Sequence, residues 1–152
     1  MLFRSLTSTI KVISEKDKVE VNFENKNLSS KNLQFFDLDN LKNLEDYTKI
    51  RAETDSEALK LRYSNRKTYQ KNSPKTSVAK SLYHLTEKIR YEKIGSDNLK
   101  GIKQNLLKNY EVIQKYKRKD QLNTKEDVSA KEAFELYLLK HFHNVKIGRA
   151  HV

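Results

Sequence analysis

The histidines are the first residues of this chain whose chemistry could serve catalysis or metal binding. His141-x-His143 presents two imidazoles, but residues two apart on a helix do not share a face, and no nearby carboxylate pair completes a metal shell. A position at a helix end is therefore favoured for both, where the cationic form also suits the helix dipole. His84 stands beside Tyr83 and close to Glu87, and without a positioned partner a surface or core-edge histidine is favoured over a general base.

Thiol chemistry and ATP hydrolysis are not expected, because the sequence lacks the residues that they need. It has no cysteine, which excludes a disulfide framework, thiol catalysis and thiolate metal sites. It has no glycine-rich loop followed by Lys and Ser or Thr, so ATP hydrolysis by this chain is not expected. The sequence thus predicts no catalytic, cofactor-binding or metal-binding residue, and a helical enzyme would need a pocket of convergent ionisable groups that the pattern does not offer.

Oppositely charged residues are spaced to pair across one helical turn. Arg51 can pair with Asp55, Arg90 with Glu87, and Lys88 with Glu92 in the same way. Such pairs contribute about 0.2–0.5 kcal/mol each when they are exposed. They therefore indicate helices before they indicate a site.

Glycines mark a turn between two amphipathic helices. Gly95 is predicted to end the first helix, because glycine takes the left-handed conformation cheaply, and Ser96 or Asp97 can then cap the next helix. Gly101 falls inside the following helical pattern, where glycine costs about 1 kcal/mol against alanine. It therefore predicts close approach of another helix, and Asn105, one turn on, can hydrogen-bond across that contact.

Hydrophobic periodicity predicts a mainly α fold of about five helices with a small N-terminal two-stranded β ribbon. The alternation of Val19, Val21 and Phe23 predicts one strand, with residues 33–36 as its only nearby partner. Ser73 and Pro74 suit the N-cap and first position of a helix, and Thr124 with Asp127, or Ser129 with Glu132, can cap the last one. The expected helices are residues 2–13, residues 44 or 45 to 71, 74–94, 97–119, and a last one through Phe134, Leu138 and Phe142.

Composition limits the class of protein. The 152 residues suit one domain, and 36% hydrophobic against 34% charged residues favours amphipathic helices under a charged surface. Only 3 glycines and 1 proline are too few for the turns of an all-β fold. The N-terminus lacks the apolar core of a signal peptide, and no run approaches membrane-spanning length, so a cytoplasmic protein without a membrane partner is expected.

The net charge of +11 raises the alternative of a basic helical nucleic-acid-binding protein. Tyrosines interleaved with lysines could stack bases. However, lysine greatly outnumbers arginine, as expected of a protein encoded by AT-rich DNA, and lysine-rich faces are usually just solvated. Nucleic-acid binding is therefore an alternative function, with solvation of a lysine-rich surface favoured over it.

Three blocks of the sequence stand out together. They are an early run from Leu6 to Phe23, then Arg51-x-x-x-Asp55-Ser56-x-Ala58-Leu59-x-Leu61, and Glu87-x-x-Arg90-x-Glu92-x-x-Gly95 followed by Gly101-Ile102-x-x-Asn105-Leu106. In order and spacing these blocks resemble the N-terminal region of the cobaltochelatase von Willebrand A-type subunit, the CobT family. The resemblance covers roughly residues 2–116.

The resemblance implies membership of a multi-subunit, oligomeric, ATP-dependent ligase that forms nitrogen–metal bonds. This machine inserts Co²⁺ into a corrin ring during cobalamin biosynthesis, using ATP and Mg²⁺. A large subunit binds the tetrapyrrole and an AAA+ subunit hydrolyses ATP, while the present region is a non-catalytic part that acts in assembly or in coupling to the AAA+ subunit. The structural or interface candidates on the matched blocks are Arg51, Asp55, Arg90, Glu92, Gly95, Gly101 and Asn105.

The chain departs from the family pattern at several positions. Ala52 and Thr54 stand where Gly and Ala are expected, and Ser64-Asn65 stands where a His-Asp pair is expected. The second change removes any metal or proton role for the pair, although polar residues preserve an exposed helix face. Asp127-x-Ser129 is similar to the start of the D-x-S-x-S metal motif, but Lys131 replaces the second serine and no strand precedes it, so a helix cap is favoured.

The last residues suggest a truncated chain. Residues 147–152, IGRAHV, are what the start of a common sequencing adapter encodes in one frame. We therefore expect residues 1–146 to form the helical domain, and residues 147–152 to be a read-through scar in place of the von Willebrand A-type domain. The alternative is a genuine C-terminus.

Overall fold

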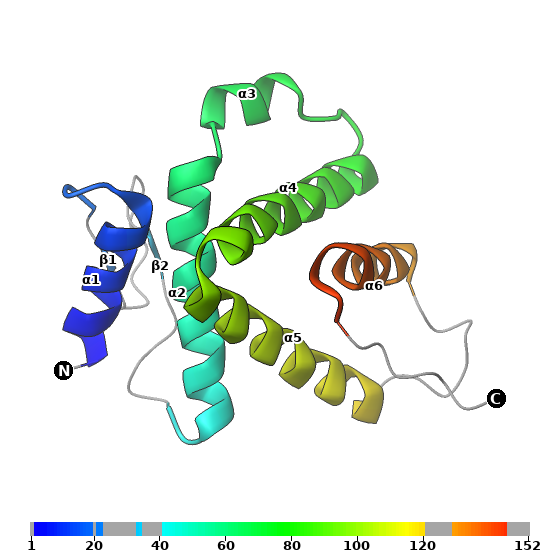
Figure 1. Ribbon diagram of the computed structural model, residues 1–152. Coiled ribbons are helices and arrows are strands. Elements are labelled where there is room, and N and C mark those ends of the chain that lie inside the picture. Colours follow the sequence, from blue (N-terminus) through cyan, green and yellow to red (C-terminus); the bar gives the residue numbers. More distant parts are fainter. Residues whose placement is uncertain (1, 20, 23–32, 35–40, 121–128, 146–152) are drawn as a thin grey trace.

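The computed structural model describes residues 2–19, 21–22, 33–34, 41–120 and 129–145. This part of the chain is mainly helical, which confirms the predicted class. Its helices are α1 (Leu2–Ser14), α2 (Leu44–Tyr63), α3 (Arg66–Lys71), α4 (Ser77–Asn98), α5 (Lys100–Asp120) and α6 (Ala130–His143). Helix α2 runs through the middle with α1 on one side, α4 and α5 diverge from an elbow on the other, and α6 lies in their opening (Figure 1).

Two very short strands follow α1. β1 (Val21–Asn22) and β2 (Leu33–Gln34) pair in parallel, with Val21 opposite Leu33. Phe23 and residues 35–36, which the predicted ribbon also needs, lie outside the described residues. The full ribbon therefore stays a prediction.

Side-chain caps set most helix starts. Asn43 and Asp46 form a reciprocal capping box at α2, with Asp46 N donating to Asn43 Oδ1 at 2.8 Å. Ser129 Oγ accepts from Glu132 N at 3.2 Å, which confirms the second of the two caps predicted for α6. Thr124 and Asp127 lie outside the described residues.

The predicted start of α4 was wrong. Ser73 and Pro74 do not begin a helix, because Thr76 caps α4 and its first residue is Ser77. The local preference of proline for a first helical position has no effect here, since the chain stays non-helical through residues 74–76.

The continuous helix predicted from residue 44 or 45 to residue 71 is two helices. Ser64 is the extended C-cap of α2 and Asn65 caps α3, its side chain accepting from Thr68 N at 3.1 Å. Ser64 therefore ends α2, and Asn65 starts α3 through its own side chain. The sequence predicts that Ser64 and Asn65 lie on an exposed helix face. The structure places them instead at the corner between α2 and α3.

Neither glycine has the role predicted for it. Gly95 is inside α4, which continues to Asn98, and the elbow forms at Leu99 with extended backbone angles. A Cβ built on Gly95 would lie 2.9 Å from Leu59 Cγ and nearer still to both Leu59 methyl groups, whereas one built on Gly101 would meet nothing within 4 Å. Gly95 is therefore the point of close helix approach.

The core lies along α2. Leu6 and Ile10 of α1 pack on one side of it, and Ile89 of α4 with Leu106 of α5 pack on the other. Leu59 at the centre is fully buried. This apolar packing brings polar side chains of α2, α4 and α5 together at the same level.

We predict opposite effects of Gly95→Ala and Gly101→Ala on stability. Overpacking against Leu59 costs about 1–3 kcal/mol, so Gly95→Ala should lower the free energy of unfolding even after the gain in helix propensity. Gly101→Ala, at an open position, should raise it by about 0.5 kcal/mol. Urea unfolding of both variants measures this difference. Equal stability of the two variants would contradict the packing of α4 on α2.

Candidate functional site

Asp55 is a buried carboxylate between α2 and α5. Its side chain is 1% exposed, and Asn105 Nδ2 donates to its Oδ2 at 2.7 Å. Arg51 Nε lies 4.0 Å from Oδ1, which has no hydrogen-bond partner among the described residues. The Asp55–Asn105 hydrogen bond thus joins α2 to α5.

Glu92 is a second buried carboxylate and joins α4 to both of the other helices. Ser56 Oγ of α2 donates to its Oε1 at 2.6 Å, and the Tyr110 hydroxyl of α5 donates to its Oε2. Lys88 Nζ lies 3.9 Å from Oε1. We call the side chains around Asp55 and Glu92 the buried carboxylate network: Arg51, Asp55, Ser56, Lys88, Glu92, Asn105 and Tyr110.

Burial dominates the electrostatics of this network. It raises the pKa of Glu92 above its ordinary value, although Lys88 and the two hydroxyl donors oppose the shift. It raises the pKa of Asp55 in the same way, against the effects of Asn105 and Arg51. Burial and the neighbouring Glu92 also raise the pKa of the Tyr110 phenol, which therefore remains a hydrogen-bond donor.

An ion pair nearer the surface connects α4 to the end of α2. Arg90 donates to Glu87 through Nε at 2.7 Å and Nη2 at 2.8 Å, and Nη2 also donates to the Tyr63 carbonyl at 2.8 Å. Ser64 Oγ donates to Glu87 at 2.8 Å. The hydrogen bonds from Arg90 are the main reason that the pKa of Glu87 is lowered.

A cavity of about 300 Å³ lies beside Glu92, between α2, α4 and α5. Burial raises the pKa of Glu53 on its wall, and lowers the pKa of His84, where the nearby cations Lys60 and Lys88 add to the effect. Within the described ranges no three His, Asp or Glu side chains are grouped to hold a metal ion. None of the helices in that part of the chain is long and apolar enough to cross a bilayer.

The structure brings together most of the residues singled out from the sequence. Arg51, Asp55, Glu92 and Asn105 belong to the buried carboxylate network. Arg90 and Gly95 lie elsewhere on the contact of α4 with α2. Gly101 is exposed and apart from them. Their assignment as interface residues stays a prediction.

Sequence reasoning missed two members of the network. Ser56 is a matched position to which the sequence assigns no role, and Tyr110 is one of the tyrosines interleaved with lysines, for which base stacking is the only role considered from the sequence. A tyrosine on the apolar stripe of α5 gives a usable signal, because a buried phenol needs a polar partner. Its partner, Glu92, is on another helix, so local spacing does not reveal it.

His143 occupies the helix end that the sequence predicts, but in a different environment. It is the last residue of α6 and 4% exposed, near the Tyr110 ring. Burial is the largest effect and lowers its pKa, although a hydrogen bond with the Ile89 backbone opposes this. Burial therefore disfavours the cationic form that would suit the helix dipole.

The fold and the network define a small helical domain in which buried carboxylates join three helices. The model of the family described as cobalamin biosynthesis protein CobT matches residues 2–148. The chain therefore belongs to the CobT family, which implies a role in cobalamin biosynthesis. Comparison with curated proteins and with solved structures gave no match.

We predict that Glu92→Gln changes how stability depends on pH. A raised folded pKa means that the protonated form of Glu92 stabilises the fold below the ordinary pKa of 4.5, and that this contribution is lost as pH rises through the folded pKa. The variant lacks this loss, so its stability relative to the parent should grow with pH between the ordinary and the folded pKa, with a slope of about 1.4 kcal/mol per pH unit.

Urea unfolding between about pH 4 and 8 measures this difference. Glu111→Gln on the exposed side of α5 is the control and should show no comparable trend. A constant difference between Glu92→Gln and the parent would mean that Glu92 titrates normally.

Proposed function

We propose that this chain is part of an ATP-dependent cobaltochelatase that inserts Co²⁺ into a corrin ring, and that it acts in assembly or in coupling to an AAA+ subunit. In this proposal the AAA+ subunit binds ATP and Mg²⁺, and a large subunit binds the tetrapyrrole. The match to the CobT family over residues 2–148 is the observation that carries the proposal. In such a complex, ATP hydrolysis and metal insertion occur on different subunits, so we propose that this chain transmits movement between them.

A coupling element has to move as one body and to bind its partner through exposed side chains. The buried carboxylate network supports the first requirement, because it joins α2, α4 and α5 through Asp55 and Glu92. A displacement applied to one of these helices is then passed to the other two. This is the mechanism that we propose for the domain, with no chemical step on its own residues.

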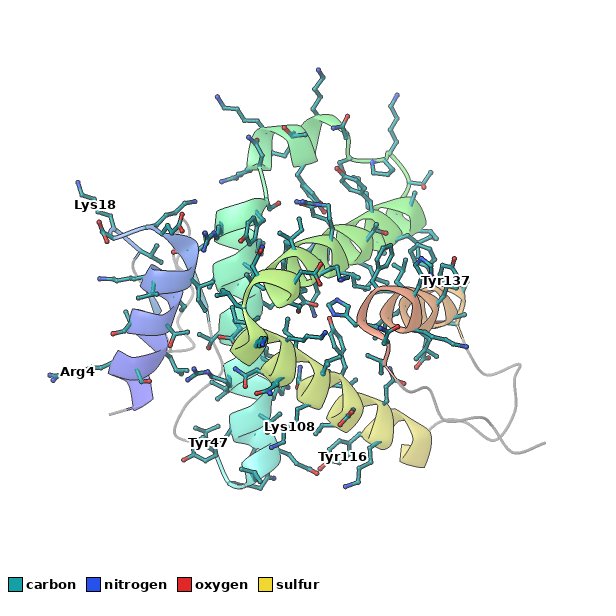
Figure 2. The ribbon with its side chains drawn as sticks, viewed as in Figure 1. Arg4, Lys18, Tyr47, Lys108, Tyr116 and Tyr137 are labelled. Carbon is teal, nitrogen blue, oxygen red and sulfur yellow. The ribbon has the colours of Figure 1, made fainter. Side chains whose placement is uncertain are left out.

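An apolar patch at one end of α2 and α5 suits the second requirement. It comprises Leu44, Tyr47 and Tyr116, which are 71%, 49% and 49% exposed. Figure 2 shows both tyrosines at this end of the molecule, and the Tyr116 hydroxyl donates to Glu45 of α2. Large apolar side chains of this kind are enriched in protein interfaces. We propose this patch as the contact for the AAA+ subunit.

Association with the AAA+ subunit from the same source tests the proposal. We expect binding of the full chain to persist when salt is raised from about 0.1 M to 1 M, because an apolar contact is weakly screened. Leu44→Ser should weaken it by about tenfold, the effect of removing roughly 1.4 kcal/mol of apolar burial. Analytical ultracentrifugation or surface plasmon resonance measures both effects.

Val78→Ser is the matched control, since Val78 is also 71% exposed but lies in the first turn of α4. It should bind as the parent does. If no association occurs, the coupling role is wrong. If instead the chain binds nucleic acid with an affinity that falls steeply with salt, the basic nucleic-acid-binding protein replaces it.

A further inference from the structure

The corner of the molecule formed by α3 carries charge of one sign. Between Ser64 and Thr86 the chain has no Asp or Glu but five Lys or Arg residues. All five are exposed, and four of them, Arg66, Lys67, Lys71 and Lys75, belong to α3 or to the segment between α3 and α4. None of these four forms an ion pair with another described residue, whereas Lys60, Arg62 and Arg90 on the adjoining helices do. Nitrogen-tipped side chains project outward from this corner (Figure 2).

A cavity of about 430 Å³ opens beside the same corner. Leu61 of α2, Tyr69 of α3 and Tyr91 of α4 give it apolar walls. This volume is within the range of sites that hold small molecules or single side chains. The cavity exists because the chain breaks at Ser64 and α3 turns away from α2.

Cations also converge on this cavity from three separate segments. Lys16 follows α1, Lys60 is on α2 and Arg66 begins α3. Its one acidic lining residue, Glu87, already accepts hydrogen bonds from Arg90 and Ser64. The cavity thus combines apolar walls with a positive rim that is continuous, through Arg66, with the exposed cations of α3.

We propose that this corner binds an acidic peptide segment of a partner protein, with an apolar anchor side chain in the cavity and its carboxylates on Arg66, Lys67 and Lys71. The inference is independent of the AAA+ contact, which involves the opposite end of α2. A single apolar side chain would be buried by Leu61 and Tyr91. The flanking carboxylates would be steered by the positive field around α3.

A peptide fits this surface better than a nucleic acid does. Base stacking requires open aromatic faces, but the ring of Tyr69 is stacked on Tyr83, with centroids 4.9 Å apart and planes at 24°. The edge contact with His84, at 6.4 Å between centroids, occupies the ring further. The aromatic residues here form the wall of a cavity and not a stacking platform.

Fluorescence anisotropy tests the proposal. The probe is a labelled peptide with a central Phe that is flanked on both sides by Asp and Glu. We expect saturable binding to the full chain. Replacing the central Phe by Ser should weaken it by about tenfold or more, because the anchor burial is lost. Arg66→Gln or Lys71→Gln should each weaken it by about two- to fivefold, as expected for exposed ion pairs.

The triple variant Arg66→Gln/Lys67→Gln/Lys71→Gln should reduce affinity by about tenfold or more if the separate effects add. The matched control is Lys100→Gln/Lys103→Gln/Lys108→Gln on α5, which has the same net charge and also changes exposed residues. Lys108 lies at the far end of the molecule from α3 (Figure 2). Circular dichroism establishes that both triple variants remain folded.

The control triple should bind the peptide like the parent. Equal weakening by the two triples would show that only net charge matters and would overturn the proposal. So would equal binding of the peptide that has Ser in place of Phe. A single-stranded oligonucleotide that binds more tightly and displaces the peptide would replace the proposed ligand with a nucleic acid.

Discussion

The burial of Glu92 is the constraint on which the packing of this domain depends. A carboxyl group that is 1% exposed loses its hydrogen bonds to water and needs hydrogen-bond partners within the protein to replace them. Those donors, Ser56 and Tyr110, are on different helices. Satisfying one carboxylate therefore sets the positions of three helices relative to one another. Asp55 of α2 is buried in the same way, and its hydrogen bond from Asn105 joins α2 to α5.

Close packing and polar satisfaction depend on each other here. Gly95 lets α4 approach Leu59 of α2 closely, and this approach keeps Glu92 within reach of Ser56. A larger side chain at position 95 would separate the helices and lengthen that hydrogen bond. Helix–helix distance and hydrogen-bond geometry are thus set by the same contact. This coupling gives a small domain the rigidity that the proposed mechanical role needs.

Much of the fold follows from local sequence signals. The apolar stripes of α1, α2, α4 and α5, and the Ser129 cap of α6, are predictable because each depends on residues within a few positions of one another. The errors have a common physical cause. Gly95 is expected to end a helix when only its own conformational freedom is considered and not the side chain of Leu59, which is 36 positions away in the sequence.

In the candidate site, too, contacts within one helix can be predicted from the sequence and contacts between helices cannot. The pairing of Arg51 with Asp55 is visible as helical spacing, whereas the donors to Glu92 are not, because Ser56 and Tyr110 reach it from other helices. The break at Ser64 and Asn65 has a local signal, the capping ability of Asn65, but it competes with a helical pattern on both sides. Contacts between helices determine which donors reach Glu92. The cavity beside α3 could not be foreseen without that break.

Hydrogen–deuterium exchange of the full chain shows whether α2, α4 and α5 open together. If the buried carboxylates join three helices into one body, amides in the middle of α2, α4 and α5 should share one free energy of opening, while those of α3 should open more easily. If α5 exchanges through a separate opening of lower free energy than α2 and α4, the hydrogen bonds of Tyr110 and Asn105 do not hold it. That result would contradict the account of this domain as a rigid coupling element.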